Sequence, residues 1–280
     1  MITRGLANMT SVLGRRGRGP GPEAKWEGPR LPPGRRIYAI GDVHGQLAPL
    51  QVLHGLIRAD LQDRPVARPV LVHLGDLIDR GPDSAGVVEL LAQGSPAGGV
   101  PTVNLMGNHE WMFLLALARR GPGDADHWLD NGGEATLASW GIRASTPPER
   151  WPGLIPRAHV RFLQGLAGRW GAGAYVFAHA GVRPGRPLDE QVWGDLLWIR
   201  APFLDQPGPL LPDAPGAVVV HGHTPQTEPS AGPHRIGVDT GAGRGGPLTC
   251  AVLEGDEVRF LQAPPMSKGD GRLATIAGLR

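Results

Sequence analysis

Apolar and polar positions alternate in blocks along the first half of the chain. Three apolar runs have the length of buried strands: residues 37–40, 70–74 and 100–105. Each leads into a polar, glycine-containing segment and then into a helical pattern, at residues 47–57, 83–93 and 111–118. This repeated order of strand, polar loop and helix predicts a sheet with functional loops at its strand ends and helices packed outside.

The pattern changes in the second half. Residues 124–170 hold four tryptophans among glycines, prolines and short helical patterns, which predicts a helical insert flanking the functional loops. Strand patterns then return in close succession, at residues 174–178, 217–220, 234–238, 248–253 and 258–262. The last two are expected to pair as a hairpin around Gly255 and Asp256. Strands without intervening helices indicate a second sheet stacked on the first. The predicted fold class is therefore α/β, a two-sheet β-sandwich flanked by α-helices.

Composition fixes the expected domain boundaries. The 280 residues suit one large domain with an appendage, and glycine (43) and proline (29) indicate a loop-rich chain. Residues 1–34 are rich in arginine, glycine and proline and are predicted to be a disordered basic tail. The domain is expected at residues 35–263, followed by a frayed tail at 264–280.

Charge and cysteine usage exclude several classes of protein. The net charge is only +2, and no aromatic ladder accompanies the basic tail, so specific nucleic-acid binding is not expected. The single Cys250 excludes an intrachain disulfide and is predicted to be a buried thiol. No apolar stretch has the length of a membrane span, and the N-terminus lacks the apolar region of a secretory signal. We therefore expect a cytoplasmic protein, monomeric by default.

Five short segments carry the candidate chemistry. They read GDVHG (41–45), GDLIDRG (75–81), GNHE (107–110), HAG (179–181) and GHTP (222–225). Asp42 and His44 lie two residues apart after a strand, so both side chains can grip one ion. Asp76 follows the next strand, and its two oxygens can bridge two ions.

The remaining donors complete a mixed set of oxygen and nitrogen ligands. Asn108 offers an amide oxygen after the third strand, and His179 and His223 arrive from later strands. Such a set suits Mn, Fe or Zn better than Ca. Two ions about 3.5–4 Å apart are the usual clamp for attack at phosphorus, with a bridging water that becomes hydroxide at neutral pH. No serine or cysteine nucleophile occupies these segments.

Acid catalysis and phosphate binding have candidates as well. His109 lies beside Asn108, and a histidine held by a carboxylate such as Asp79 is a good general acid for an alkoxide leaving group. Arg80 can fork onto phosphate oxygens.

The complete GDxHG, GDxxDRG and GNHE signatures resemble the phosphoprotein phosphatase family, in its bacterial serine/threonine phosphatase branch of the calcineurin-like metallophosphoesterases. The resemblance covers residues 37–255. It implies a β-sandwich flanked by helices and two divalent metals, Mn²⁺ above all. It assigns one metal to Asp42, His44 and Asp76, and the second to Asp76, Asn108, His179 and His223.

The resemblance also implies that His109 is the acid steered by Asp79, and that Arg80 and Arg200 bind the substrate phosphate, together with Asn108. Arg200 rests on the segment LLWIR (196–200) alone. His221 stays open as an alternative to His223, because Pro225 stands where the wider superfamily has a second histidine. The segment WLDNGG (128–133) is open between a groove wall and helix packing.

Three functions are compatible with these residues. The leading one is hydrolysis of phosphoserine and phosphothreonine on a phosphoprotein, with phosphotyrosine as a further substrate. A dinucleoside-polyphosphate hydrolase, acting for example on diadenosine tetraphosphate, is the alternative. The matching segments of that enzyme class resemble GDLxARG and GNHD, with alanine and aspartate where this chain has Asp79 and Glu110. A non-catalytic phosphopeptide-binding protein is disfavoured by the complete ligand set.

Overall fold

The apolar runs at the start of the chain become parallel neighbours in one sheet. In the computed structural model, which describes residues 29–94, 96–119 and 121–265, β1 (Arg35–Ile40) pairs in parallel with β2 (Arg68–His73). β2 pairs in parallel with β3 (Thr102–Asn104). The closing hairpin, β9 (Leu248–Glu254) and β10 (Glu257–Ala263), forms as expected. It joins the first sheet, however, because β9 pairs antiparallel with β1.

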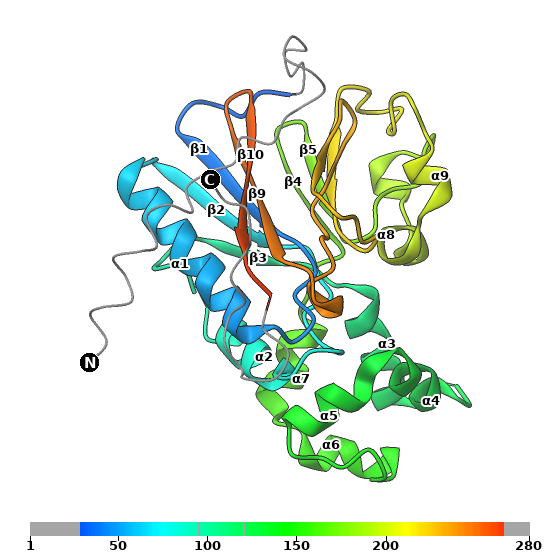
Figure 1. The fold of residues 1–280 in the computed structure, drawn as a ribbon. Helices are drawn as coiled ribbons and strands as arrows, with labels where there is room; N and C mark the ends of the chain where they lie inside the picture. Colours follow the sequence, from blue (N-terminus) through cyan, green and yellow to red (C-terminus); the bar gives the residue numbers. More distant parts are fainter. Residues whose placement is uncertain (1–28, 95, 120, 266–280) are drawn as a thin grey trace, which may run out of the picture.

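The later strands build a second sheet, also of five strands, that faces the first (Figure 1). Its order is β4-β5-β6-β8-β7. The strands are β4 (Arg169–Ala172), β5 (Tyr175–Ala178), β6 (Val218–His221), β7 (Ser230–Ala231) and β8 (Arg235–Gly237). β5, β6 and β8 run parallel to one another. Two helices that the sequence pattern did not predict, α8 (Trp193–Trp198) and α9 (Ala201–Leu204), lie between β5 and β6 in the chain.

The strands are apolar on both faces because each sheet lies between two layers. Ile37 and Ala39 of β1 point into the core between the sheets, where Phe177 and Val220 meet them. Tyr38 and Ile40 point to the opposite face and pack against helices. A third core joins the outer face of the second sheet to Phe203 and its neighbours on α8 and α9. The architecture is thus four layers, helix–sheet–sheet–helix.

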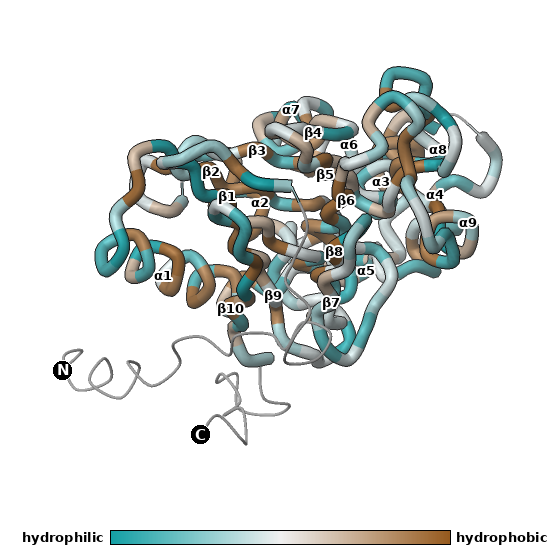
Figure 2. The backbone as a smooth tube through the Cα atoms, turned by 90° about the horizontal axis from the view of Figure 1, so that it is seen from above, coloured by the Kyte–Doolittle hydropathy of each residue, from teal (hydrophilic) through white to brown (hydrophobic). Residues whose placement is uncertain are grey.

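Helices cover the outside of the first sheet and one end of the molecule. α1 (Leu47–Asp63) is amphipathic and buries Leu50, Leu53 and Ile57, and brown and teal turns alternate along it in Figure 2. α2 (Ser84–Ala92) starts at Asp83, whose side chain accepts a hydrogen bond from the Gly86 amide. The other helices are α3 (Asn108–Ala118), α4 (Asp124–Trp128), α5 (Glu134–Ser139), α6 (Trp151–Leu154) and α7 (Arg157–Gln164).

The expected insert at residues 124–170 is helical as far as Gln164, and Trp170 lies in β4. Of the two expected tails, residues 1–28 and 266–280 lie outside the described residues. Leu31 is buried, and its amide donates to the Gly255 carbonyl, so described residues before β1 lie against the β9–β10 hairpin. Across the described residues, no helix combines the length and apolar character needed to cross a bilayer.

A buried chain of polar side chains runs from α1 to β3 along the helix-covered face of the first sheet. His73 Nδ1 lies 2.7 Å from Asn104 Oδ1, and His73 Nε2 lies 3.1 Å from His54 Nε2. Burial disfavours the charged form of both rings. In the neutral His73 ring, Nδ1 donates to the Asn104 oxygen and Nε2 carries the lone pair that accepts from His54. Burial lowers the pKa of His54 to about 2 and that of His73 to about 4.

These depressed pKa values predict acid sensitivity. Below pH 6.5 the unfolded chain binds protons on both histidines while the folded chain does not, so the free energy of unfolding falls as pH decreases. Each histidine contributes about 1.4 kcal/mol per pH unit until its folded-state pKa is reached. Urea unfolding at pH 7 and pH 5 measures this slope. His73→Gln should flatten it. An unaltered slope in His73→Gln would contradict the account.

Candidate active site

The predicted site residues meet at the carboxyl ends of parallel strands from both sheets. Asp42 and His44 follow β1, Asp76 follows β2, Asn108 follows β3, His179 follows β5 and His223 follows β6. All six are buried. Since the carboxyl ends of parallel strands share one edge, residues far apart in the chain are brought together there, as is usual for open α/β sheets.

The backbone is strained where these side chains leave it. The described residues include six non-glycine positions with positive φ, and five belong to the polar segments: His44, Asp76, Asp79, Arg80 and His223. Such conformations cost roughly 1–3 kcal/mol each and persist only when the surroundings over-determine them. This clustering indicates that the fold holds these side chains in place despite an unfavourable backbone conformation.

Two groups of ligand atoms share Asp76. One comprises His44, Asp76 and His109, and the other Asp76, His179 and His223; within each group the atoms lie within 4.8 Å of one another. His44 Nε2 lies 3.6 Å from Asp76 Oδ2, and His179 Nε2 lies 3.3 Å from Asp76 Oδ1. The two carboxylate oxygens thus face different groups. Imidazole and carboxylate donors in this arrangement fit divalent metal ions.

Hydrogen bonds and burial favour the neutral form of the histidines, which is the form that binds metal. His44 Nδ1 donates to the Ile78 carbonyl over 2.9 Å, and His179 Nδ1 donates to the Leu74 carbonyl over 3.0 Å. These backbone bonds leave the Nε2 lone pair of each ring directed into the site, as in most metal-ligating histidines. Burial lowers the pKa of His44 and of His223 to about 3, and it also lowers that of His179. Asn108 Oδ1 lies 3.0 Å from His179 Nε2 and 2.9 Å from His223 Nδ1.

Asp42 lies at the site but outside both groups. Its two oxygens accept from the His223 amide, each over 3.1 Å. Burial and the neighbouring Asp239 raise the pKa of Asp42 well above its usual value. The expected trio of Asp42, His44 and Asp76 is therefore adjacent in space, yet His109 takes the third place in the compact group around His44.

His109 and Asp79 form a buried dyad. His109 Nδ1 lies 2.7 Å from Asp79 Oδ2, so Nδ1 donates to the carboxylate and Nε2 faces the metal-ligand groups. Burial opposes the charged imidazole, but Asp76 and Asp79 raise the pKa of His109 overall. Asp79 also accepts from Trp128 Nε1 over 2.9 Å and from Thr136 Oγ1 over 2.7 Å. Its carboxylate is thereby fixed in one orientation.

Arg80 points into the site between the two histidines. One guanidinium nitrogen lies 2.6 Å from His44 Nε2 and another lies 2.9 Å from His109 Nε2. The WLDNGG segment supports it, because the Arg80 amide donates to the Gly132 carbonyl. A methyl group on Gly132 would lie 2.8 Å from Arg80 Cγ, and φ there is +103°, so this position favours glycine. Trp128 itself is fully buried and packs in the core, whereas Asp130 in the same segment is exposed.

Glu110 was used in the sequence interpretation only to separate families, yet it organises the loop after β2. Its carboxylate accepts from four backbone amides, those of Gly107, Asp76, Leu77 and Ile78, over 2.7–3.1 Å. Burial and the nearby Asp76 raise the pKa of Glu110 to about 7, against donors that favour the charged form. The sequence signal for this role was the position of Glu110 as the third residue of α3. A glutamate there commonly accepts hydrogen bonds from the free backbone amides at the start of the helix.

Asp239 was missed entirely. It is buried, follows β8, and raises the pKa of Asp42 by repulsion. The sequence signal was the same as for the other residues, an aspartate directly after a strand.

The structure also places two weaker candidates, Arg200 and His221. Arg200 is exposed at the start of α9 and near enough to His223 to lower its pKa. His221 bonds to the Gly222 carbonyl and belongs to neither ligand group.

Known proteins are similar to this chain in sequence. The calcineurin-like phosphoesterase family model matches residues 35–244. The serine/threonine-protein phosphatase 1 of Salmonella typhimurium is 30% identical over 223 residues, covering 79% of this chain and 93% of the relative. The asymmetrical bis(5'-nucleosyl)-tetraphosphatase PrpE of Geobacillus thermodenitrificans is 30% identical over 238 residues, covering 76% of this chain and 88% of the relative.

The fold has solved counterparts as well. The crystal structure of a cold-active protein-tyrosine phosphatase from a Shewanella species superposes with a TM-score of 0.54, covering 84% of this chain and 83% of that protein at 18% identity. With the family match over residues 35–244 and the two ligand groups that share Asp76, the chain belongs to the calcineurin-like metallophosphoesterases.

Proposed function

We propose that this phosphoesterase hydrolyses phosphoserine and phosphothreonine on proteins, with phosphotyrosine as a further substrate. The observation that carries the proposal is one carboxylate, Asp76, shared by two groups of candidate metal-ligand atoms, with His109 of the first group held by Asp79. A phosphoryl group bound there would meet ligands for divalent metals and a proton donor in the same site.

The proposed ligands are Asp42, His44, Asp76, Asn108, His179 and His223. Divalent ions held by them, Mn²⁺ by preference with Fe or Zn as alternatives, would supply a nucleophile from water and neutralise phosphate charge. A cytoplasmic location and a monomeric state remain predictions.

The chain's own groups supply positioning and a proton. Arg80 and Arg200 bind phosphate oxygens by charge-assisted hydrogen bonds, and Asn108 orients the same group. Hydrolysis forms one P–O bond to a water oxygen and breaks the P–O bond to the seryl oxygen. His109 Nε2 donates its proton to that departing oxygen, which leaves as the alcohol. Asp79 holds the ring so that Nε2 stays directed at the leaving group.

Two observations support a protein substrate. Dinucleotide hydrolases resemble GDLxARG and GNHD, with alanine and aspartate at the positions of Asp79 and Glu110 in this chain. Both Asp79 and Glu110 make buried contacts here. The Salmonella phosphatase also covers most of this chain.

A dinucleoside polyphosphate is the second candidate substrate. The Geobacillus tetraphosphatase is equally identical over a similar share of the chain. The metal-ligand groups act on the phosphoryl group alone, and both substrate classes present one.

Asp76→Asn should lose metal and activity together. Both groups of ligand atoms contain Asp76, and an amide is a weaker metal ligand than a carboxylate. Elemental analysis of the purified variant measures occupancy independently of turnover, and Asp83→Asn at the start of α2 is the matched control. EDTA should abolish wild-type activity and Mn²⁺ should restore it. Full turnover by Asp76→Asn would refute the bridging role.

Asp79→Asn should retain metal but slow turnover, because the amide cannot orient and stabilise the protonated ring of His109. We expect roughly a 100-fold loss on a phosphoserine peptide and a loss of less than about tenfold on p-nitrophenyl phosphate, whose leaving group needs no proton. Steady-state kinetics on both substrates measure the difference. Equal losses on the two would contradict the acid dyad.

A single comparison tests the substrate class. Mn²⁺-loaded protein is assayed on phosphoserine, phosphothreonine and phosphotyrosine peptides and on diadenosine tetraphosphate. We expect the highest kcat/KM for a phosphoserine or phosphothreonine peptide. A clear preference for the dinucleotide would replace the proposal by its alternative.

A further inference from the structure

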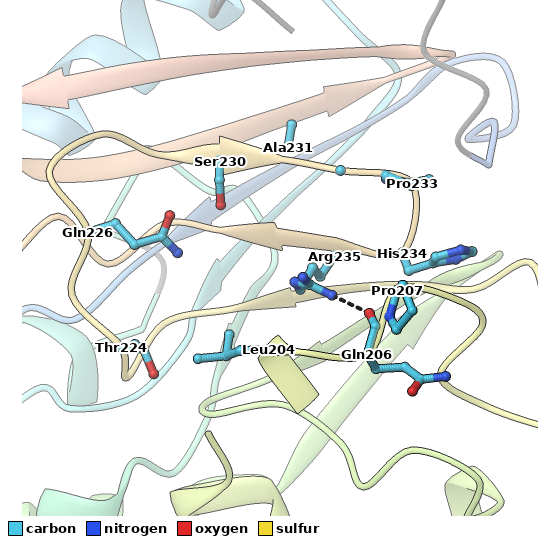
Figure 3. A pocket seen from close by; sticks show the side chains of 11 residues that line it. Leu204, Gln206, Pro207, Thr224, Gln226, Ser230, Ala231, Pro233, His234 and Arg235 are labelled. Carbon is cyan, nitrogen blue, oxygen red and sulfur yellow. Dashed lines mark hydrogen bonds between the residues drawn. The ribbon is translucent and has the colours of Figure 1, made fainter. Parts of the chain in front are cut away.

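A pocket of about 460 Å³ lies at the β7–β8 edge of the second sheet (Figure 3). It is formed by the loop after α9, the turn that follows His223, and the β7–β8 hairpin. Its volume is in the range of ligand-binding clefts. Six polar side chains line it: Gln206, Thr224, Gln226, Ser230, His234 and Arg235. None of the lining residues is acidic.

Arg235 gives the pocket an uncompensated positive charge. It is partly buried, and its Nη1 donates to the Gln206 carbonyl over 2.9 Å, the dashed line in Figure 3. Within the described part of the chain, no carboxylate forms an ion pair with it. Removal of a charge from water is costly unless a counter-charge is present, so the free edge of this guanidinium favours an anion.

Unpartnered polar atoms gather at the same place. Among the described residues, four buried side-chain nitrogen or oxygen atoms have no hydrogen-bond partner, and two of them, Thr224 Oγ1 and His234 Nδ1, belong to residues that line the pocket. A third, His221 Nε2, lies close by, since a methyl group on Gly237 would meet Gln226 Nε2, Ser230 Oγ and the His221 ring. Buried polar groups are normally satisfied by a hydrogen bond, so these atoms are available to bind a polar group that enters the pocket.

Consecutive residues of one turn contribute to the metal-ligand groups and to the pocket. The His223 ring contacts Asn108 in the active site, whereas the next residue, Thr224, lines the pocket. The left-handed φ of His223 (64°) makes this sharp change of direction, and the Gln226 amide fixes the turn by donating to the Asp239 carbonyl. One wall of the pocket therefore begins at the residue that follows a candidate metal ligand.

We propose that this pocket is a substrate subsite that binds the carboxylate of an acidic side chain at a fixed spacing from the phosphorylated residue. Arg235 forks onto the carboxylate, and Thr224 and His234 complete its hydrogen bonds. The glutamine amides and Ser230 suit a peptide backbone, and no Phe, Tyr or Trp lines the pocket to stack a nucleobase. The inference rests on the proposed protein phosphatase function and assigns its sequence preference.

The test uses a neutral phosphoserine peptide and variants of it in which one glutamate is moved along the sequence. Wild-type protein should hydrolyse the peptide with glutamate at one particular spacing roughly tenfold faster in kcat/KM than the neutral peptide, as expected for one charge-assisted interaction. Arg235→Gln should abolish this preference while retaining the rates on the neutral peptide and on p-nitrophenyl phosphate. Arg169→Gln, an exposed arginine on β4 at the far edge of the same sheet, should keep the preference.

A measurement on the wild type alone guards against misfolding of the variant. The preference for the acidic peptide should decline at high ionic strength more than the rate on the neutral peptide does. Hydrolysis of phosphopeptides without any acidic preference, or an equal preference in Arg235→Gln, overturns this inference alone. A selective loss of diadenosine tetraphosphate hydrolysis in Arg235→Gln overturns it in favour of a nucleotide pocket. Failure to hydrolyse any phosphopeptide overturns the proposed function and the inference together.

Discussion

The Glu110 carboxylate is the interaction on which the site depends most. It is buried in the first turn of α3 and gathers the amides of Gly107, Asp76, Leu77 and Ile78. These four bonds join the loop after β2 to the start of α3, so the residues that follow two neighbouring strands are fixed relative to each other. Without such an anion, four buried amides would lose their acceptors, at a cost of about 1–3 kcal/mol for each group left unsatisfied.

From that anchor the arrangement extends outward by direct contacts. Asp76 leaves the anchored loop in a left-handed conformation and accepts from the His109 amide, so α3 and the loop share a second bond. His109 reaches Asp79, and Asp79 reaches Trp128 and Thr136 in the helical region. The helices therefore brace the acid dyad, whereas the second sheet contributes His179 and His223 from its strand ends. The proposed catalytic groups are thus held by contacts within the packed fold.

The repeated order of strand, loop and helix was predicted well from the sequence, because buried parallel strands and their polar carboxyl ends leave a strong local pattern. It predicted six residues that converge on one edge. Sheet membership was less accessible, since β9 looks like any late strand until its pairing with β1 is known. Short elements such as β7 carry too few residues for a period. Asp239 and Glu110 were missed or undervalued because their roles come from partners distant in the chain.

The left-handed backbone at His44, Asp76, Asp79, Arg80 and His223 has a consequence for how this chain responds to selection. Glycine adopts this conformation without the roughly 1–2 kcal/mol penalty that a side chain carries. Glycine at these positions would relieve the backbone but would delete a proposed metal ligand, acid-orienting group or phosphate contact. At Asp79 it would also leave the Trp128 and Thr136 donors without their acceptor. We therefore expect that substitutions which relax the backbone at these five positions lower hydrolytic activity.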